Sequence, residues 1–463
     1  MSAYKAPANG FRTFVIVWLS QSVSVLGTQL TIFAINIWLA TVLYARPEQK
    51  PQLAWAMTAL SLSHFLPVIL FTPMAGAWAD RHDRKRTMLV VDIMSGVVSL
   101  TMALLMWQGY LSLWSLLAGA SIYGILGAFH NSAFDTAYAM LVPDSQLPRA
   151  NGMMQTMWAL AFIFAPGLAA MLVSIPQFAQ QGQWGGALGH LLAGLSSGTP
   201  LAIAIDGVSF LGAALVLAFL TVPSPKRADL GTDGKPKRSM AADIREGAVY
   251  IWRRRPMLWL LGTFTLFNAL GQWGLITPLL VKYNLAADWA ARGMSYETAL
   301  ATVNTIGSIG GVIAGVGVSM WGGLKRRRVY GVVVPLLITA ILQILYGFSP
   351  TVIYAAAFSF LIGLVIPAAN VHSQAIWQTQ VPRELQGRVF AVRRVIAQAT
   401  GPIGMTMVGW LAGRFDPGMV LVAFGAVLVV FCAGQLINPG LLKVEDKEYL
   451  DRMAQAKAEA MGD

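Results

Sequence analysis

The chain has 463 residues, of which 56% are hydrophobic and only 12% are charged. Soluble globular proteins carry about 25% charged residues, so this chain has too little charge to cover two or three soluble domains. Lipid must therefore be the solvent for much of the protein. The formal net charge of +12 does not indicate nucleic-acid binding, because the bases form short blocks between apolar segments. That distribution is typical of loops at the inner face of a membrane.

The single cysteine, Cys432, excludes an internal disulfide. No cluster of His, Cys, Asp and Glu has metal-ligand spacing, so we expect neither a metal nor another cofactor. The first apolar run begins near Phe14 and exceeds the length of a signal-peptide core, and no cleavage site of small residues follows it. We therefore expect no cleavable signal peptide.

Twelve segments are long and apolar enough to cross a bilayer, which takes about 20 residues for a helix. They are predicted to begin near residues 14, 54, 87, 112, 152, 200, 257, 298, 328, 351, 389 and 418. The expected fold is an all-α integral membrane protein with two six-helix bundles. The expected domains are a first bundle at 1–222, a cytoplasmic linker at 223–256, a second bundle at 257–442 and a cytoplasmic tail at 443–463.

The basic residues predict the orientation of these helices. With the N-terminus in the cytoplasm, 28 of the 33 Lys and Arg residues fall in inner segments and 5 in outer segments. This asymmetry places both termini in the cytoplasm. We expect the protein to lie in the inner membrane of a cell. The outer loop at 176–199 is long and weakly polar, so a short interfacial helix and a flexible cover both remain open. The tail is expected to form a short helix.

The two halves repeat three features in the same order. VPDSQLPRANG follows the fourth predicted helix and VPRELQGRVFA follows the tenth, basic clusters follow the second and eighth, and proline–glycine pairs interrupt the fifth and eleventh. Such a repeat predicts a duplicated six-helix unit. Secondary transporters are commonly built in this way, with the substrate site between the repeats near the membrane midplane.

The loop after the second predicted helix resembles the signature of the major facilitator superfamily. It reads Gly76-Ala77-Trp78-Ala79-Asp80-Arg81-His82-Asp83-Arg84-Lys85-Arg86, in which Asp83 replaces an expected glycine. Asp also tolerates left-handed turn conformations. Three further segments, LVPDSQLPRANG, IDGVSFLGAAL and VPRELQGRVFAVRR, are similar to the macrolide-efflux and enterobactin-exporter branch of that family. The resemblance implies proton-driven export of amphipathic compounds.

The signature loop has two open interpretations. Either the bases are topological and hold the loop inside, or the motif acts as a conformational latch made by Gly76, Asp80, Arg81, Arg84, Lys85 and Arg86. The resemblance implies that Asp80 pairs near the start of the eleventh helix. There Arg388, Arg393 and the helix dipole would favour a carboxylate.

Acids within the spans are rare, because a charge at the bilayer centre costs on the order of 3 kcal/mol or more. We expect Asp135 to be a buried, protonatable carboxylate or a contact for a cationic substrate, with Asn131 on the same helical face. Asp206 is expected to brace its helix, with a proton or substrate site as the alternative. Asp92 is expected to pair with the bases of the signature loop.

The spans also contain histidines, prolines and many aromatic residues. His64, His130 and His372 are expected to be hydrogen-bonded packing residues, with proton relay as the alternative. The bends at Pro166–Gly167 and Gly401–Pro402 allow either close helix packing or gating. Adaptable apolar side chains suit varied substrates, and the candidate cavity aromatics are Trp38, Trp158, Phe162, Phe267 and Trp273.

Other classes of protein fit less well. The chain has no phosphate-binding G-x-x-x-x-G-K-[ST] loop of an ATP-driven pump and no nucleophile–base arrangement of an enzyme. A non-transporting sensor or a channel stays open. Within transport, a siderophore exporter is the alternative to a drug exporter. The partners expected are a small amphipathic substrate, protons and the lipid bilayer but no nucleic acid, and a monomer is the expected state.

Overall fold

The computed structural model describes residues 7, 9–143, 146–181, 186–222 and 240–461, and within these ranges it contains helices and no strands. Twelve spans are long and apolar enough to cross a membrane, as the sequence predicted. Each begins within seven residues of its predicted start. The largest differences arise where polar residues, such as Lys50–Gln52, form the first turn of a helix whose apolar run starts later. The chain is a multi-pass membrane protein.

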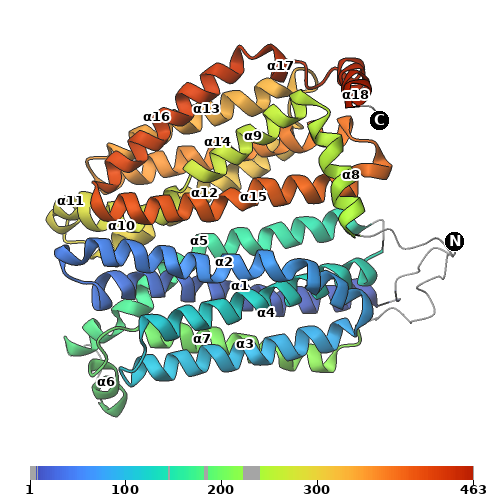
Figure 1. Ribbon diagram of the computed structural model, residues 1–463. Helices are drawn as coiled ribbons and strands as arrows, with labels where there is room; N and C mark the ends of the chain where they lie inside the picture. The colour runs from blue at the N-terminus through green and yellow to red at the C-terminus, as the bar shows by residue number, and fades with distance from the viewer. Residues whose placement is uncertain (1–6, 8, 144–145, 182–185, 223–239, 462–463) are drawn as a thin grey trace. The chain divides into compact units, whose positions relative to one another are not determined.

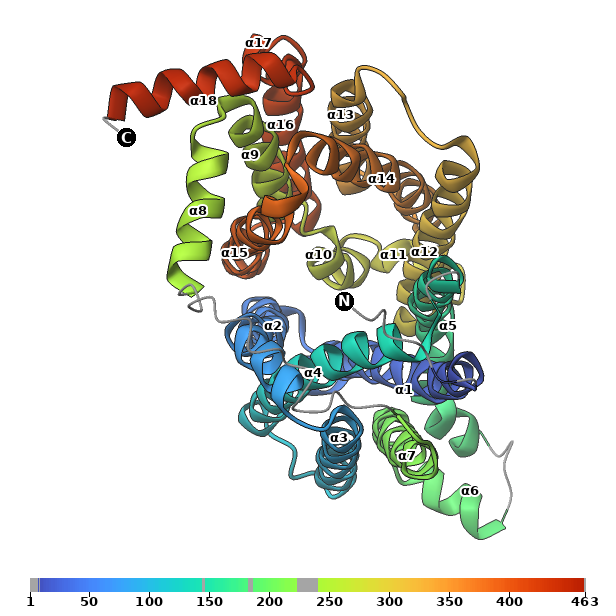
Figure 2. The ribbon, with the colours of Figure 1, turned by 90° about the vertical axis from the view of Figure 1, so that its right-hand side faces the viewer.

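The chain divides into two compact units, of which the first comprises Met1–Asp233 with Met294–Thr305, and the second comprises Gly234–Gly293 with Ile306–Asp463. The domain boundaries predicted from the sequence stay a prediction. The helices of the first unit, labelled in Figure 1, are α1 (Gly10–Trp38), α2 (Lys50–Arg81), α3 (Arg84–Trp107), α4 (Leu113–Leu141), α5 (Leu147–Gln180), α6 (Gly186–Ala193) and α7 (Thr199–Phe219). In this unit α2 packs on α4, α3 packs on α7 and α4, and α1 packs on α5 and α7, as the end-on view in Figure 2 shows.

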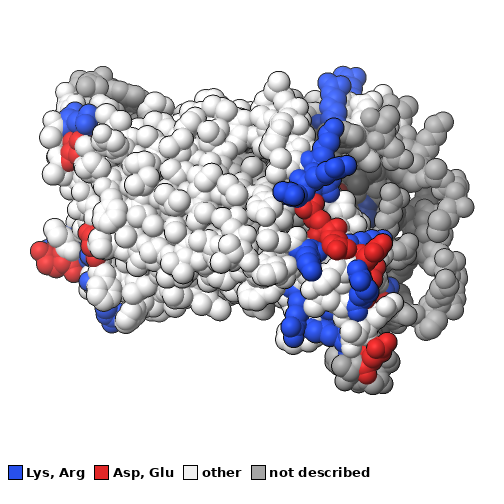
Figure 3. Space-filling view, turned by 90° about the horizontal axis from the view of Figure 1, so that it is seen from above, with Lys and Arg blue, Asp and Glu red and all other residues white. Residues whose placement is uncertain are grey.

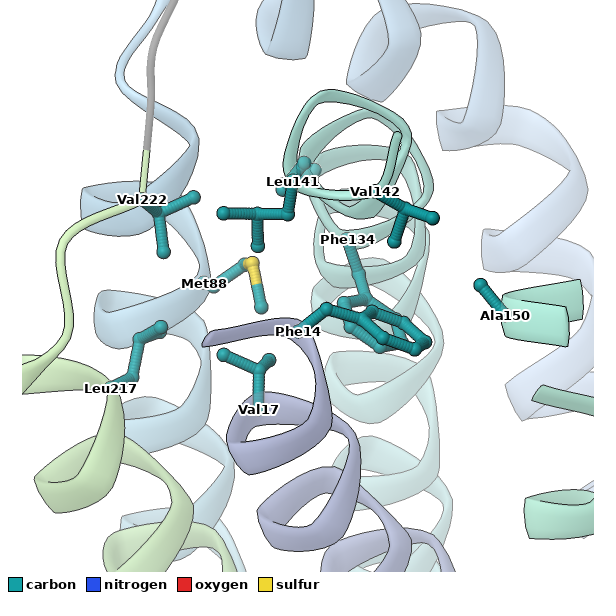
Figure 4. Packing of buried hydrophobic residues seen from close by; sticks show 11 residues of the cluster. Phe14, Val17, Met88, Phe134, Leu141, Val142, Ala150, Leu217 and Val222 are labelled. Carbon is teal, nitrogen blue, oxygen red and sulfur yellow. The ribbon is translucent and has the colours of Figure 1, made fainter. Parts of the chain in front are cut away.

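Glycine allows a close approach between α2 and α4. A Cβ atom on Gly124 of α4 would lie 3.1 Å from the Pro67 ring of α2 and closer still to the carbonyl oxygen of His64. Small residues of this kind let membrane helices approach until their backbones touch. The core at one end of the unit is apolar and comes from five helical regions (Figure 4). Its labelled members are Phe14, Val17, Met88, Phe134, Leu141, Val142, Ala150, Leu217 and Val222.

The second unit contains the remaining helices. They are α8 (Met240–Trp252), α9 (Arg255–Leu270), α10 (Trp273–Leu279), α11 (Ala286–Ala291), α12 (Tyr296–Trp321), α13 (Arg328–Gly347), α14 (Val352–Gln380), α15 (Arg383–Arg414), α16 (Pro417–Leu436), α17 (Pro439–Leu442) and α18 (Lys447–Met461). The first residues of α12, up to Thr305, belong to the first unit. Within this unit α13 packs on α14 and α16, while α15 packs on α8 and α9.

The seventh span is interrupted, which the sequence analysis did not predict. Between α9 and α10, Gly271 and Gln272 leave the helix. The amide of the buried Gln343 donates to the carbonyl oxygen of Leu270 at 3.2 Å, at the end of α9. Non-helical backbone inside a membrane is tolerated where protein groups satisfy it, and this contact supplies such a group.

Short helices lie outside the twelve spans. The predicted linker contains α8, whose Tyr250 hydroxyl donates to the carbonyl oxygen of Gln380 at 2.8 Å, and residues 223–239 of that linker lie outside the described residues. The tail forms α18, as expected, and Asp451 pairs with Arg254 at 3.0 Å. The loop at 176–199 includes the short helix α6, one of its two predicted forms.

Charged side chains are confined to the ends of the face drawn in Figure 3, and the wide band between them carries none. In the segment between α10 and α12, Asp288 accepts a hydrogen bond from the backbone N–H of Val352 at 2.8 Å, and it pairs with Arg292 at 2.9 Å. The Val352 N–H and the Arg292 guanidinium together lower the pKa of Asp288. An uncharged band flanked by charged ends is what a bilayer requires of a spanning protein.

Candidate functional site

A cavity of about 410 Å³ lies inside the first unit. Its wall is built by α1, α2, α3, α4, α5 and α7, so six segments far apart in the sequence contribute to one space. Much of the wall is apolar and includes flexible or aromatic side chains, namely Val25, Ile32, Val68, Val91, Phe134, Met154, Met157, Trp158 and Phe210. This volume and character are typical of small-molecule sites, where a few polar groups fix orientation within an apolar wall.

The predicted pair Asp135 and Asn131 lines this cavity from α4, as expected for two residues one helical turn apart. Among the described residues of the wall, Asp135 alone carries a carboxylate. The expectation that Asp135 is buried was wrong, because its side chain is exposed. The face of α4 that bears Asp135 is turned toward the cavity, so the carboxylate can meet a bound solute or water directly.

Asp206, the other predicted acid, is fully buried in α7. Hydroxyl groups from three other helices surround it. Ser99 of α3 and Thr28 of α1 each donate to the Asp206 carboxylate at 3.1 Å, and the Tyr123 hydroxyl of α4 lies 3.4 Å away. Ser99 and Tyr123 are also hydrogen-bonded to each other. Burial of a carboxylate is compensated when hydrogen bonds satisfy its oxygens, so Asp206 joins four helices.

Asp92 contacts different residues from those predicted. Its side chain is fully buried in α3, where one oxygen accepts a hydrogen bond from the Gln21 amide of α1 at 3.1 Å. The other oxygen lies 3.2 Å from Nε2 of His130 of α4. The expectation that Asp92 pairs with the bases of the signature loop was therefore wrong. Asp92 is two turns from those bases and faces α1 and α4 instead.

His130 and His64 both line the cavity, and His64 is hydrogen-bonded to the backbone of Ala120. His130 was predicted to be a packing residue, with proton relay as the alternative, and its contact with Asp92 was not predicted. A signal was present in the chain, because Asp92, Ser95 and Ser99 recur at helical spacing as a polar stripe in an apolar helix. His372 does pack as expected, since its Nε2 accepts the N–H of Leu324 at 2.7 Å.

The signature loop ties helix ends of the first unit together. Asp83 is the N-cap of α3 and accepts a hydrogen bond from the N–H of Arg86 at 2.9 Å. Its backbone is extended, with φ of −64° and ψ of 115°, so no left-handed turn is needed where the family has glycine. The buried Arg84 donates to the carbonyl oxygen of Thr136 at 3.2 Å, and Lys85 donates to that of Ala218 at 2.8 Å. These two bases therefore hold the C-terminal ends of α4 and α7, which also suits the helix dipoles.

The remaining predicted latch residues lie apart from these contacts. Gly76 is within α2, Arg81 and Arg86 are exposed, and the side chain of Asp80 is outside the described residues. In the second unit, Arg388 pairs with Glu246 of α8 at 2.7 Å. Arg393 donates to the amide oxygen of Gln374 at 2.8 Å and lies over the Trp377 ring. The latch stays a prediction.

The two proline–glycine pairs lie inside continuous helices, at Pro166–Gly167 in α5 and Gly401–Pro402 in α15. Close packing occurs near the second pair, because a Cβ on Gly404 would lie 2.8 Å from the carbonyl carbon of Ala269 in α9. The packing interpretation is thus satisfied around α15, while a gating role stays a prediction.

The predicted cavity aromatics fall into three groups. Trp158 lines the cavity, and the Phe162 ring stacks beside it with 6.1 Å between ring centroids. Trp38 is buried at the end of α1 and is not part of the cavity wall. Phe267 and Trp273 flank the break in the seventh span, with 6.0 Å between ring centroids in an edge-on arrangement. Tyr123 and Phe210 line the cavity and were not predicted.

Comparison with known families identifies the chain. A model described as the Major Facilitator Superfamily matches residues 17–405. The chain belongs to the Major Facilitator Superfamily. Its twelve spans fit this assignment, as does the likeness of the signature loop to the family's motif. The protein is therefore a member of a family of membrane transporters.

Relatives of this superfamily member include named efflux proteins. Macrolide efflux protein A of Streptococcus pyogenes is 24% identical over 427 residues, which cover 90% of this chain and 93% of that protein. The multidrug efflux pump Tap of Mycolicibacterium fortuitum is 23% identical over 376 residues, covering 76% of this chain and 80% of that protein. A solved bacterial homologue of the human lysosomal transporter Spinster has a TM-score of 0.61 at 16% identity, covering 97% of this chain and 96% of that chain. At this identity the structural likeness shows the fold alone.

Proposed function

We propose that this superfamily member is a secondary active transporter that exports amphipathic small molecules in exchange for protons by alternating access. The observation that carries the proposal is the cavity of the first unit, which combines an apolar, Met- and aromatic-containing wall with one carboxylate. Such walls can repack around different solutes. The names of the macrolide and multidrug efflux relatives support export as the direction.

The charge of the cavity favours neutral or cationic solutes. Among its described lining residues there is no Lys or Arg, whereas Asp135 supplies a negative charge. An anionic catechol siderophore would have to approach this carboxylate without a compensating base, which costs free energy in a site of low dielectric constant. The siderophore exporter is therefore the less favoured alternative. A channel or a non-transporting sensor of the same fold is the alternative from another class.

The proposal is tested by accumulation of a labelled macrolide, tetraphenylphosphonium and a catechol siderophore in cells with and without the protein. We expect lower accumulation of the first two compounds in cells that contain the protein. A protonophore should abolish the difference, because uphill export would lose its driving force, whereas flow through a channel would continue. Equal accumulation of every compound in both cell types would contradict the export function.

The orientation of the chain and the latch belong to the same proposal. We infer that the ends bearing the signature loop, α8 and α18 face the cytoplasm, because the basic residues concentrate there. We propose a monomer in the inner membrane. A closed latch at Asp80 would favour the outward-facing state of the transport cycle.

Asp80→Asn is expected to shift the population toward the inward-facing state, because it removes the negative charge of the latch. Cysteines placed at the cytoplasmic ends of helices would then react faster with a thiol reagent in the variant than in the parent. The matched control is Asp83→Asn, which keeps the side-chain oxygen of the helix cap. Unchanged reactivity together with unchanged transport in Asp80→Asn would eliminate the latch.

A further inference from the structure

We propose that Asp92 and His130 form the proton-binding pair through which the first unit couples proton movement to the solute in its cavity. The inference rests on the proposed function and names the group that carries the proton. It follows from the position of the pair, which joins a fully buried carboxylate to a ring that lines the cavity.

The pair has one side in the protein and one side in the cavity. Asp92 has no exposed surface, and its carboxylate is held by the Gln21 amide at 3.1 Å. Nε2 of His130 lies 3.2 Å from the other Asp92 oxygen, and the side chain of His130 is 14% exposed. Protons can therefore reach the imidazole from the cavity, whereas the Asp92 carboxylate has no exposed surface of its own. The geometry makes His130 the entry point and Asp92 the counter-charge.

The surrounding groups explain why the free energy of the pair depends strongly on whether His130 is protonated. The described titratable groups that face the same space are His64 from α2 and Tyr123 and Asp135 from α4, while Asp206 of α7 accepts a hydrogen bond from Ser99 of α3. From α1 come Gln21 and Ser24, and from α5 only uncharged side chains. When His130 is neutral, no positive charge remains beside the buried Asp92 anion, which keeps its hydrogen bond from the Gln21 amide. That state costs free energy which the protonated, net-neutral pair avoids.

Loss of the proton is therefore linked to both the solute and the helices. A cationic solute beside Asp135 disfavours a second positive charge on His130, so the imidazolium loses a proton to water in the cavity. Once His130 is neutral, it attracts the Asp92 anion less, which weakens the contact between α3 and α4. The hydrogen bond between Asp92 and Gln21 of α1 remains. A reciprocal competition of this kind is what exchange of solute for proton requires, since linkage acts equally in both directions.

The test uses the full-length protein in proteoliposomes, with labelled erythromycin and tetraphenylphosphonium as probes. Accumulation driven by an imposed pH gradient is compared with exchange of labelled for unlabelled probe without a gradient. The variants are His130→Gln, which keeps an amide nitrogen within reach of Asp92, and Asp92→Asn, which keeps the side-chain shape. His190→Gln is the matched control, because His190 is an exposed histidine of α6 that does not line the cavity.

We expect gradient-driven accumulation to fall at least about tenfold in His130→Gln and Asp92→Asn, within the usual range of coupling between two sites. Exchange without a gradient should persist in both variants, which shows that they fold and bind the probe, and His190→Gln should retain both activities. Gradient-driven accumulation at the parent level in His130→Gln would overturn the proposal, as would loss of both activities in both variants. If the parent protein itself shows no gradient-driven accumulation, the proposed function fails rather than the assignment of the pair.

Discussion

Asp206→Ala is expected to lower the free energy of unfolding of the first unit by about 3 kcal/mol. The substitution removes the acceptor shared by Ser99 and Thr28, beside which Tyr123 also lies, and it leaves their hydroxyl groups buried among four helices. Each buried polar group that loses its partner costs about 1–3 kcal/mol, and part of this is recovered through other acceptors, such as the Ser24 carbonyl oxygen that Thr28 already contacts. The measurement is thermal or denaturant unfolding of the purified protein in detergent.

Asp206→Asn is the matched variant, because its side-chain oxygen still accepts a hydrogen bond. We expect it to be clearly more stable than Asp206→Ala. Asp206→Asn also distinguishes the two predicted roles of Asp206. If this variant folds and a pH gradient still drives transport, Asp206 is a structural brace. A variant that folds but has lost gradient-driven transport would make Asp206 the proton site. Stability of Asp206→Ala equal to that of the parent would contradict the four-helix junction.

Asp135→Asn is expected to reduce export of tetraphenylphosphonium by about tenfold or more, while export of neutral triphenylphosphine oxide changes much less. The two solutes have similar size and apolar surface, so their difference reports the charge. A carboxylate about 4 Å from a cation contributes up to about 4 kcal/mol at an effective dielectric constant of 20, which exceeds the roughly 1.4 kcal/mol needed for a tenfold effect. Initial export rates from preloaded cells provide the measurement.

Two further variants sharpen this result. Asp135→Glu keeps the negative charge and should keep most of the export of the cation, whereas Asn131→Ala changes a neighbouring lining residue without changing charge. Equal loss of both solutes in Asp135→Asn would mean that Asp135 supports the fold or the transport cycle rather than recognising positive charge. Unchanged export of both would remove Asp135 from the substrate site.

The roles of the three acids depend on how deeply each is buried, and the sequence alone does not show this. Asp92, Asp135 and Asp206 each stand in an apolar helix, so they look alike along the chain. In the structure Asp135 faces the cavity, Asp206 is enclosed by hydroxyls and Asp92 faces an imidazole. The free energy of a carboxylate depends on its neighbours from other helices, and those neighbours are 38 to 178 residues away in sequence.

The sequence by itself determined the twelve spans and the similarity of the signature loop to its family. These properties depend on local quantities, because the transfer of about 20 consecutive side chains into lipid decides where a helix lies. Tertiary structure decided which face of each helix is buried, why α9 ends at Leu270 beside Gln343, and that Gln21, Asp92 and His130 meet. A transmembrane helix is apolar on nearly every side, so its sequence carries little periodic signal to say which polar side chain faces a neighbour.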